Sequence, residues 1–264
     1  IDISAFNDHA FRCSCGNNRL DVVKWLLEIK PDIDISADND FTFSWSCQEG
    51  NIEIVKLLLN VKPDIDILMN DNDSFISSCR FGHIEVAKWL LKLNPKIYNL
   101  VNNNDIFLNA CIYGYYEIAK WIFNMDINNE IDISNNNDYI FRKTCEMGQI
   151  EIVKWLLEIK PDIDISSDND YSFRMSCSNG HLKVAMFLLE KNPDIDISIK
   201  KEFSFLMACK KGHLKVSIWL LEIKPDIDIS IKNDYAFRMA CQEGHIKVAK
   251  WLIKKNLYIN IQIE

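Results

Sequence analysis

The sequence predicts an all-α fold, a solenoid of about eight helix-turn-helix repeats that are joined by short β-hairpin-like fingers. Three periodic features support it: cysteines recur every 32 residues with one gap of 34, a Phe stands four residues before each, and a Gly or Asn stands three residues after. The periodic cysteines are Cys15, Cys47, Cys79, Cys111, Cys145, Cys177, Cys209 and Cys241. A repeat of this length outweighs any domain count taken from 264 residues.

The first helix of each repeat is predicted between the Phe and the turn. Phe173, Ser176 and Cys177 have the i, i+3, i+4 spacing of one buried helix face. An Asp or Asn usually precedes the Phe, as Asp170 does, and is expected to cap the helix. The Gly, replaced by Asn18 in the first repeat, indicates a turn with a left-handed backbone.

The second helix and the finger follow the turn. In the segment 150–158 only Glu151, Lys154 and Glu158 are polar, which predicts a helix with one narrow exposed stripe. A Pro such as Pro161 ends this helix. The alternating segment Asp162–Ile165 then predicts an extended finger.

The whole chain is therefore predicted to form one domain of eight repeats. Their ranges are 7–38, 39–70, 71–102, 103–136, 137–168, 169–200, 201–232 and 233–264, with a two-residue insertion within 124–130. Residues 1–4 match the end of a finger, and the last repeat keeps apolar residues such as Trp251 where a polar cap is expected. We expect the array to continue in a longer protein.

The run Ala240–Leu252 resembles the ankyrin repeat, with two small residues, Gly244-His245 and an amphipathic second helix. The resemblance extends over all eight copies, although Phe and Cys replace the usual Leu and Ala and the Thr-Pro-Leu-His opening is absent. We expect the Asn-Asp-Tyr segments, such as 169–171, to supply the hydrogen bonds between repeats instead. The Asn-, Ile- and Lys-rich composition resembles ankyrin proteins of giant amoeba-infecting viruses.

This resemblance implies a non-catalytic, monomeric scaffold that binds a protein partner on its concave surface. An alternative is an adaptor that recruits a substrate to a larger complex such as a ubiquitin ligase. The sequence has no nucleophile elbow, phosphate loop or His-Glu-x-x-His motif, so neither an enzyme nor a cofactor is expected. No apolar run is long enough for a membrane span, and the nine cysteines suit reduced thiols, so we expect an intracellular location: the cytoplasm, or a host cell if the protein is viral.

Metal and nucleic acid are the remote alternatives. The recurring Cys-x-x-Gly-His, as in Cys177 and His181, offers two zinc ligands where a structural site needs four. The packing interpretation places the Cys in the core and the His against the turn. A net charge of −8 argues against nucleic acid, although the chain has 15 basic and 11 acidic residues after residue 168. Four lysines of the seventh repeat, Lys200, Lys201, Lys210 and Lys211, are expected at the presumed groove.

Function is expected where the copies differ. In ankyrin proteins, the two residues after the Cys position face the concave surface, and here they are most apolar in the third and fourth repeats. The third finger and the start of the second helix of the fourth repeat also carry aromatic residues. The candidate partner-binding residues are Arg80, Phe81, Tyr98, Ile112, Tyr113, Tyr115, Glu146, Met147, Lys210 and Lys211. Phe81, Tyr98, Ile112, Tyr113 and Tyr115 are expected to form an exposed binding patch with Arg80 beside it. Alternatively, the longer finger covers their rings, which then belong to the local core.

Overall fold

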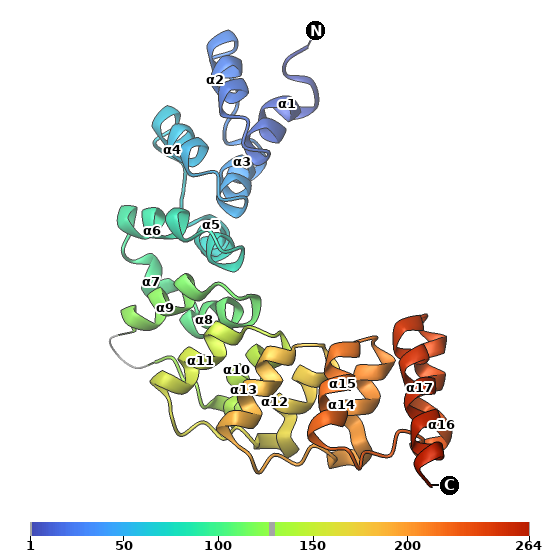
Figure 1. Ribbon diagram of the computed structural model, residues 1–264. Helices are drawn as coiled ribbons and strands as arrows, with labels where there is room; N and C mark the ends of the chain where they lie inside the picture. Colours follow the sequence, from blue (N-terminus) through green and yellow to red (C-terminus); the bar gives the residue numbers. More distant parts are fainter. Residues whose placement is uncertain (1, 127–129, 264) are drawn as a thin grey trace. The chain divides into compact units, whose positions relative to one another are not determined.

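A computed structural model describes residues 2–126 and 130–263, and the regular secondary structure of this part of the chain is entirely helical (Figure 1). In the first half the helices are α1 Ala5–Gly16, α2 Leu20–Ile29, α3 Ala37–Gln48, α4 Ile52–Val61, α5 Met69–Arg80, α6 Ile84–Leu93, α7 Ile97–Leu100, α8 Asn103–Tyr113 and α9 Tyr116–Met125. In the second half they are α10 Asn135–Glu146, α11 Ile150–Ile159, α12 Ser167–Ser178, α13 Leu182–Lys191, α14 Ile199–Lys210, α15 Leu214–Ile223, α16 Ile231–Gln242 and α17 Ile246–Ile263.

The helices form eight pairs, as the sequence period predicts, and α7 is the one extra helix of the described chain. A glycine with positive φ, such as Gly180 at +82°, turns the chain between the two helices of a pair. The first helices pack side by side, as α10, α12, α14 and α16 do, and second helices such as α11 and α13 form a second layer. The unit is therefore the predicted helix-turn-helix.

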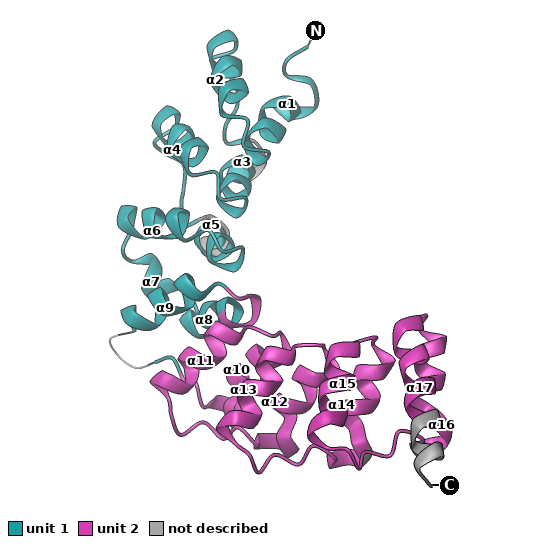
Figure 2. Ribbon diagram, in the orientation of Figure 1, with its two compact units in different colours: residues 1–110, 115–131 teal, residues 111–114, 132–264 magenta. Residues whose placement is uncertain are grey.

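The chain divides into two compact units (Figure 2). The first contains residues 1–110 and 115–131, and the second contains residues 111–114 and 132–264. Each unit has its own row of packed helix pairs.

The periodic Phe and Cys residues form the core. The Phe side chain is at most 1% exposed in seven repeats, and the Cys before the turn is equally buried in the same seven. In several repeats the Phe also contacts a tryptophan of the following repeat. The ring centroids of Phe173 and Trp219, for example, lie 6.2 Å apart. One repeat therefore covers the core of its neighbour, as expected for units too small to fold alone.

Among the described residues, an unusual turn lies within the first residues of α1, α10, α12 and α16. Three consecutive residues have left-handed backbone angles at 6–8, 136–138, 168–170 and 232–234, and most of them are Asn or Asp, which tolerate this conformation best. An arginine one turn later binds the carbonyl groups that this turn leaves exposed. In α12, Arg174 Nε donates to the Asn169 carbonyl at 2.7 Å and Nη2 donates to the Asp168 carbonyl at 3.0 Å.

In two of these turns, at 136–138 and 168–170, the aspartate joins neighbouring repeats and does not cap its own helix as expected. Asp138 Oδ2 accepts a hydrogen bond from the backbone N–H of Asp164, and Asp170 Oδ2 accepts one from Asp196, at 3.3 and 3.4 Å. The left-handed backbone turns each carboxylate toward the next finger. The Asp of the Asn-Asp-Tyr segment thus supplies the bond between repeats.

The fingers differ from the expected β-hairpin shape, because no strand occurs in the described residues. Asp164 Oδ1 accepts a hydrogen bond from the backbone N–H of Ser166, and Asp196 does the same for Ser198, both at 3.0 Å. These local bonds close the backbone into turns and use N–H groups that a strand would need. The third finger forms the short helix α7, and part of the predicted insertion, residues 127–129, lies outside the described residues.

Candidate partner-binding surface

The candidate residues that follow the buried cysteines lie at the ends of the first helices, where the copies differ most. Phe81, Tyr113 and Met147 each follow the buried cysteine by two residues, and their side chains are 45%, 54% and 42% exposed. The cysteines beside them are fully or almost fully buried. The shared residues therefore build the core, and the varying residues remain accessible.

In the first unit the structure gives the candidate residues different roles. Arg80 is exposed beside a hollow of about 130 Å³ lined by Ile76, Asn102 and Asn109 among others. Tyr115 packs so closely over Gly82 that a Cβ at Gly82 would lie 2.6 Å from the Tyr115 ring. Phe81, by contrast, is exposed.

Tyr98 lies on α7, and its hydroxyl is buried without a hydrogen-bond partner. It lines a hollow of about 470 Å³ together with Asn103, Asp126 and Glu130. Burial, followed by the negative charges of Asp126 and Glu130, raises the pKa of Tyr98.

In the second unit, residues of three repeats form one hydrogen-bonded network. Glu146 Oε2 accepts hydrogen bonds from Lys143 Nζ and from Tyr171 OH, both at 2.7 Å. Asn179 Nδ2 donates to the Glu146 carbonyl at 2.9 Å, and Lys211 Nζ donates to Asn179 Oδ1 at 2.8 Å. We call these five residues the Glu146 network. It unites the predicted residues Glu146 and Lys211, and Met147 and Lys210 are their chain neighbours.

Electrostatics favour a charged carboxylate in this network. Partial burial alone would raise the pKa of Glu146, but the hydrogen bonds from Lys143 and Tyr171 and the charge of Lys211 hold it below its ordinary value. The same contacts raise the pKa of Lys143, chiefly through its bond to Glu146. Both groups are therefore ionised at neutral pH, and the Glu146 carboxylate is already paired with Lys143 of its own chain.

A second feature of this surface is an alternation of guanidinium groups and aromatic rings. Arg142 lies 5.3 Å from the centroid of the Tyr171 ring, and Arg174 lies 5.7 Å from Tyr171 and 5.4 Å from Phe203. We call these four residues the cation-ring ladder. Such contacts hold the rings in place.

Sequence reasoning missed the cation-ring ladder and assigned no binding role to Lys143. The available signal was a Tyr or Phe two residues before the periodic Phe in the fifth to eighth repeats: Tyr139, Tyr171, Phe203 and Tyr235. Ile112 and Tyr113 also belong to the second unit. There Gln149 Nε2 donates to the Ile112 carbonyl at 3.2 Å. Lys200 is exposed, whereas the side chain of Lys201 lies outside the described part.

The cysteine and histidine ladders have packing roles. Burial raises the pKa of Cys209 to about 12, and its Sγ lies 3.4 Å from Ser217 Oγ. His213 packs on Gly180 of the preceding repeat. Within the described residues, no group of three His, Cys, Asp or Glu side chains is placed to hold a metal ion.

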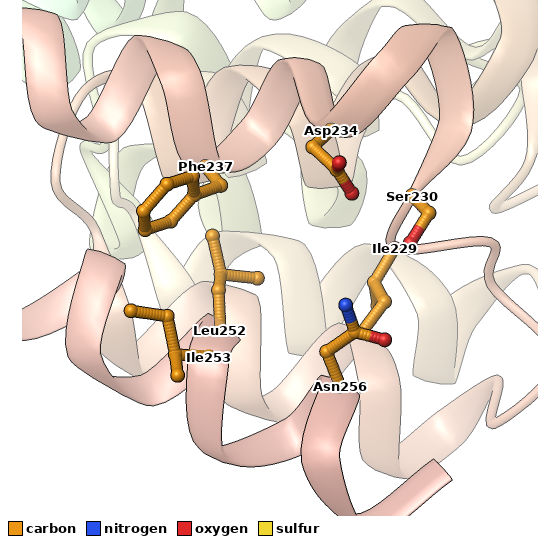
Figure 3. Close-up of a pocket in the computed structure, with 7 residues that line it drawn as sticks. All are labelled: Ile229, Ser230, Asp234, Phe237, Leu252, Ile253 and Asn256. Carbon is orange, nitrogen blue, oxygen red and sulfur yellow. The ribbon is translucent and has the colours of Figure 1, made fainter. Parts of the chain in front are cut away.

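The last helix pair contains a hollow of about 210 Å³, shown in Figure 3. Phe237 of α16 and Leu252 and Ile253 of α17 line it, with Asp234 and Asn256 near its rim. Phe237 occupies the position whose Phe is covered by the next repeat elsewhere in the chain. The apolar lining is therefore the surface that repeats use to pack on each other, and it needs no ligand to explain it.

These features define a helical repeat protein whose core residues are shared and whose exposed residues vary. A family model that describes three consecutive ankyrin repeats matches four overlapping ranges of the chain, residues 10–102, 43–137, 107–201 and 177–263. The chain therefore belongs to the ankyrin repeat family. Ankyrin repeats are typically non-catalytic modules for protein–protein interaction. No curated protein matches the chain, so no relative supports the resemblance to giant-virus proteins. In the described residues, no helix is both long and apolar enough to span a membrane.

Proposed function

We propose that the chain is a non-catalytic scaffold that binds a protein partner through the exposed ends of its first helices. The observation that carries the proposal is the contrast within each repeat: Cys79 and Cys111 are buried, whereas Phe81 and Tyr113, two residues further on, are about half exposed. Exposed aromatic residues at such positions add nothing to the shared core and are typical anchors of protein interfaces.

The repeat architecture also supports display of a rigid surface. Each repeat is fixed to the next by buried ring contacts and by bonds such as that from the Asp164 N–H to Asp138. A rigid surface loses little conformational entropy when a partner binds, so more of the contact energy contributes to affinity. We further propose that the protein works as a monomer inside the cell, since buried free thiols suit a reducing compartment.

The test is capture of partners from cell extract by the wild type and by a Phe81→Ala/Tyr113→Ala variant. We expect the variant to lose its partners while its melting temperature stays within about 2 °C of the wild type, because both side chains are exposed. A control variant, Val61→Ala/Leu93→Ala, removes apolar side chains of similar exposure from the second helices α4 and α6. It should keep the partners.

A strong loss of stability in the Phe81/Tyr113 variant would show that these rings belong to the core. Equal loss of partners in both variants would place the interface elsewhere. If the captured proteins include subunits of a ubiquitin ligase that co-purify in fixed ratio, the chain acts as a recruiting adaptor.

A further inference from the structure

We infer that the second unit binds an acidic, extended peptide segment across the ends of α10, α12 and α14, on the surface formed by the Glu146 network, the cation-ring ladder and Lys210. This inference rests on the proposed function and names the chemistry of the partner. It depends on three features of the surface, which are its charge, its geometry and the state of its rings.

The charge of the surface is positive. It contains the cations Arg142, Lys143, Lys210 and Lys211, whereas Arg174 is only 4% exposed and serves to hold the rings. Two carboxylates lie among them, and each is already bound within the chain: Glu146 by Lys143, and Asp168 by Arg142 at 3.3 Å. Lys211 is exposed, and its ammonium is held by the neutral amide of Asn179. An incoming carboxylate therefore meets a positioned cation that this amide does not neutralise.

The acidic fingers lie at the opposite end of the first helices. Asp164 and Asp196 precede α12 and α14, whereas Asn179 and Lys211 follow the last residues of these helices. The helical stretch 171–178 separates the two ends by about 12 Å at 1.5 Å per residue. That exceeds the screening length of about 8 Å at physiological salt. The fingers therefore leave the positive potential near Lys211 largely intact.

The surroundings of the aromatic rings favour a peptide over a nucleic acid as the ligand. Nonspecific single-strand binding uses aromatic faces on which bases stack. Here guanidinium groups occupy the faces of Tyr171, with Arg142 and Arg174 at 5.3 and 5.7 Å from its centroid. Arg174 also lies over Phe203. The ring edges and the exposed Met147 can pack against apolar side chains of a peptide, but the guanidinium groups compete with base stacking.

The three repeats set the length of the segment. Packed helices lie about 10 Å apart, so three first helices span about 20 Å. An extended chain covers this in six or so residues, and roughly eight allow contact at both ends. The proposed ligand is thus a short segment in which carboxylates alternate with apolar side chains.

The experiment measures fluorescence anisotropy of a labelled peptide of roughly eight residues that alternates Glu and Leu. Its Gln-for-Glu counterpart and a labelled oligouridine of similar length are the comparison probes. We expect the acidic peptide to bind the full chain and the neutral peptide to bind at least about tenfold more weakly. Binding of the acidic peptide should weaken as salt is added.

The decisive variant is Lys210→Glu/Lys211→Glu. Its matched control, Lys183→Glu/Lys215→Glu, changes the net charge equally and alters exposed lysines on α13 and α15, the second helices of the sixth and seventh repeats. We expect the first variant to lose affinity by about tenfold or more and the control to stay within about twofold. Thermal unfolding of both variants verifies that each remains folded.

Equal losses in the two variants would reduce the effect to net charge and overturn the inference. Tight binding of the neutral peptide, or tighter binding of oligouridine than of the acidic peptide, would overturn it as well. If the acidic peptide fails while partner capture still depends on Phe81 and Tyr113, the proposed function stands and the inference fails. If no partner is captured at all, the proposed function itself fails.

Discussion

The imidazole of His213 lies directly on the backbone of Gly180, the turn glycine of the preceding repeat. A Cβ at Gly180 would be 2.5 Å from His213 Nδ1, which is closer than two such atoms can approach. Gly180 is therefore required twice, by its φ of +82° and by the ring above it.

Gly180→Ala should destabilise the protein more than Gly244→Ala. Gly244 has nearly the same φ, +78°, but a Cβ at this position would have no atom within 4 Å. The backbone strain alone costs about 1 kcal/mol, and the contact with His213 adds to it only at Gly180. Urea unfolding measures both, and adding His213→Ala to Gly180→Ala should relieve part of the difference. Equal costs for the two glycines would contradict the contact.

The second unit should lose stability as pH falls from about 7 to 5.5, around the ordinary histidine pKa of about 6.5. Burial lowers the pKa of His181 and of His213. The charges of Lys211, His181 and His245 lower the pKa of His213 further. The unfolded chain therefore binds protons before the folded chain does, so acid favours unfolding and stability returns as pH rises.

The matched variant for this effect is His213→Gln, because Gln149 fills the same position in the fifth repeat and packs on Gly114. Its unfolding free energy should depend less on pH across this window than that of the wild type. An unchanged slope would show that His213 does not contribute to it.

Asp138→Asn should be tolerated better than Asp138→Ala. Burial raises the pKa of Asp138, and this outweighs the lowering by the Asp164 N–H and by Lys160. An Asn keeps an acceptor for the N–H, tolerates the φ of 57° and removes the buried charge. We expect Asn to change the unfolding free energy by less than about 0.5 kcal/mol and Ala to cost about 1–2 kcal/mol. If Asn costs as much as Ala, the carboxylate charge is itself stabilising.

Arg174→Lys should be more destabilising than Arg238→Lys. Both arginines bind two carbonyls of a left-handed turn, but Arg174 is 4% exposed between two rings and Arg238 is exposed. A lysine cannot provide the planar fork or stack on the rings. We expect a cost of about 1–3 kcal/mol at Arg174 in urea unfolding. A similar small cost at both positions would mean that the rings do not depend on the guanidinium.

Cys241 should be the first of the periodic cysteines to react with iodoacetamide in the native protein. Its side chain is exposed, whereas Cys209 is fully buried with a pKa raised to about 12. Alkylation requires an accessible thiolate. Peptide mass spectrometry after brief labelling, with a urea-unfolded sample as the reference, measures the order. Rapid labelling of Cys209 would show that the repeats open readily.

Much of the fold follows from local pattern. The i, i+3, i+4 spacing of Phe173, Ser176 and Cys177 predicts one buried helix face, and that face is buried in the structure. The predicted extended shape of the fingers was wrong. Hydrogen bonds such as that from the Ser166 N–H to Asp164 depend on backbone angles that the alternation of apolar and acidic residues does not reveal. The capping role expected for Asp170 was wrong for the same reason, since its left-handed backbone directs the carboxylate to the next repeat.

The sequence by itself determined the repeat length, the helix pairs, the buried residues and the positions where copies differ, because all of these depend on residues within about one repeat of each other. Only the tertiary structure decided which varying residues meet. Lys143, Tyr171 and Lys211 come from three consecutive repeats, and their network forms because stacking places equivalent helices side by side. The same stacking covers Gly82 with Tyr115. Distance along the chain cannot distinguish a ring that packs on a neighbouring repeat from a ring that remains exposed.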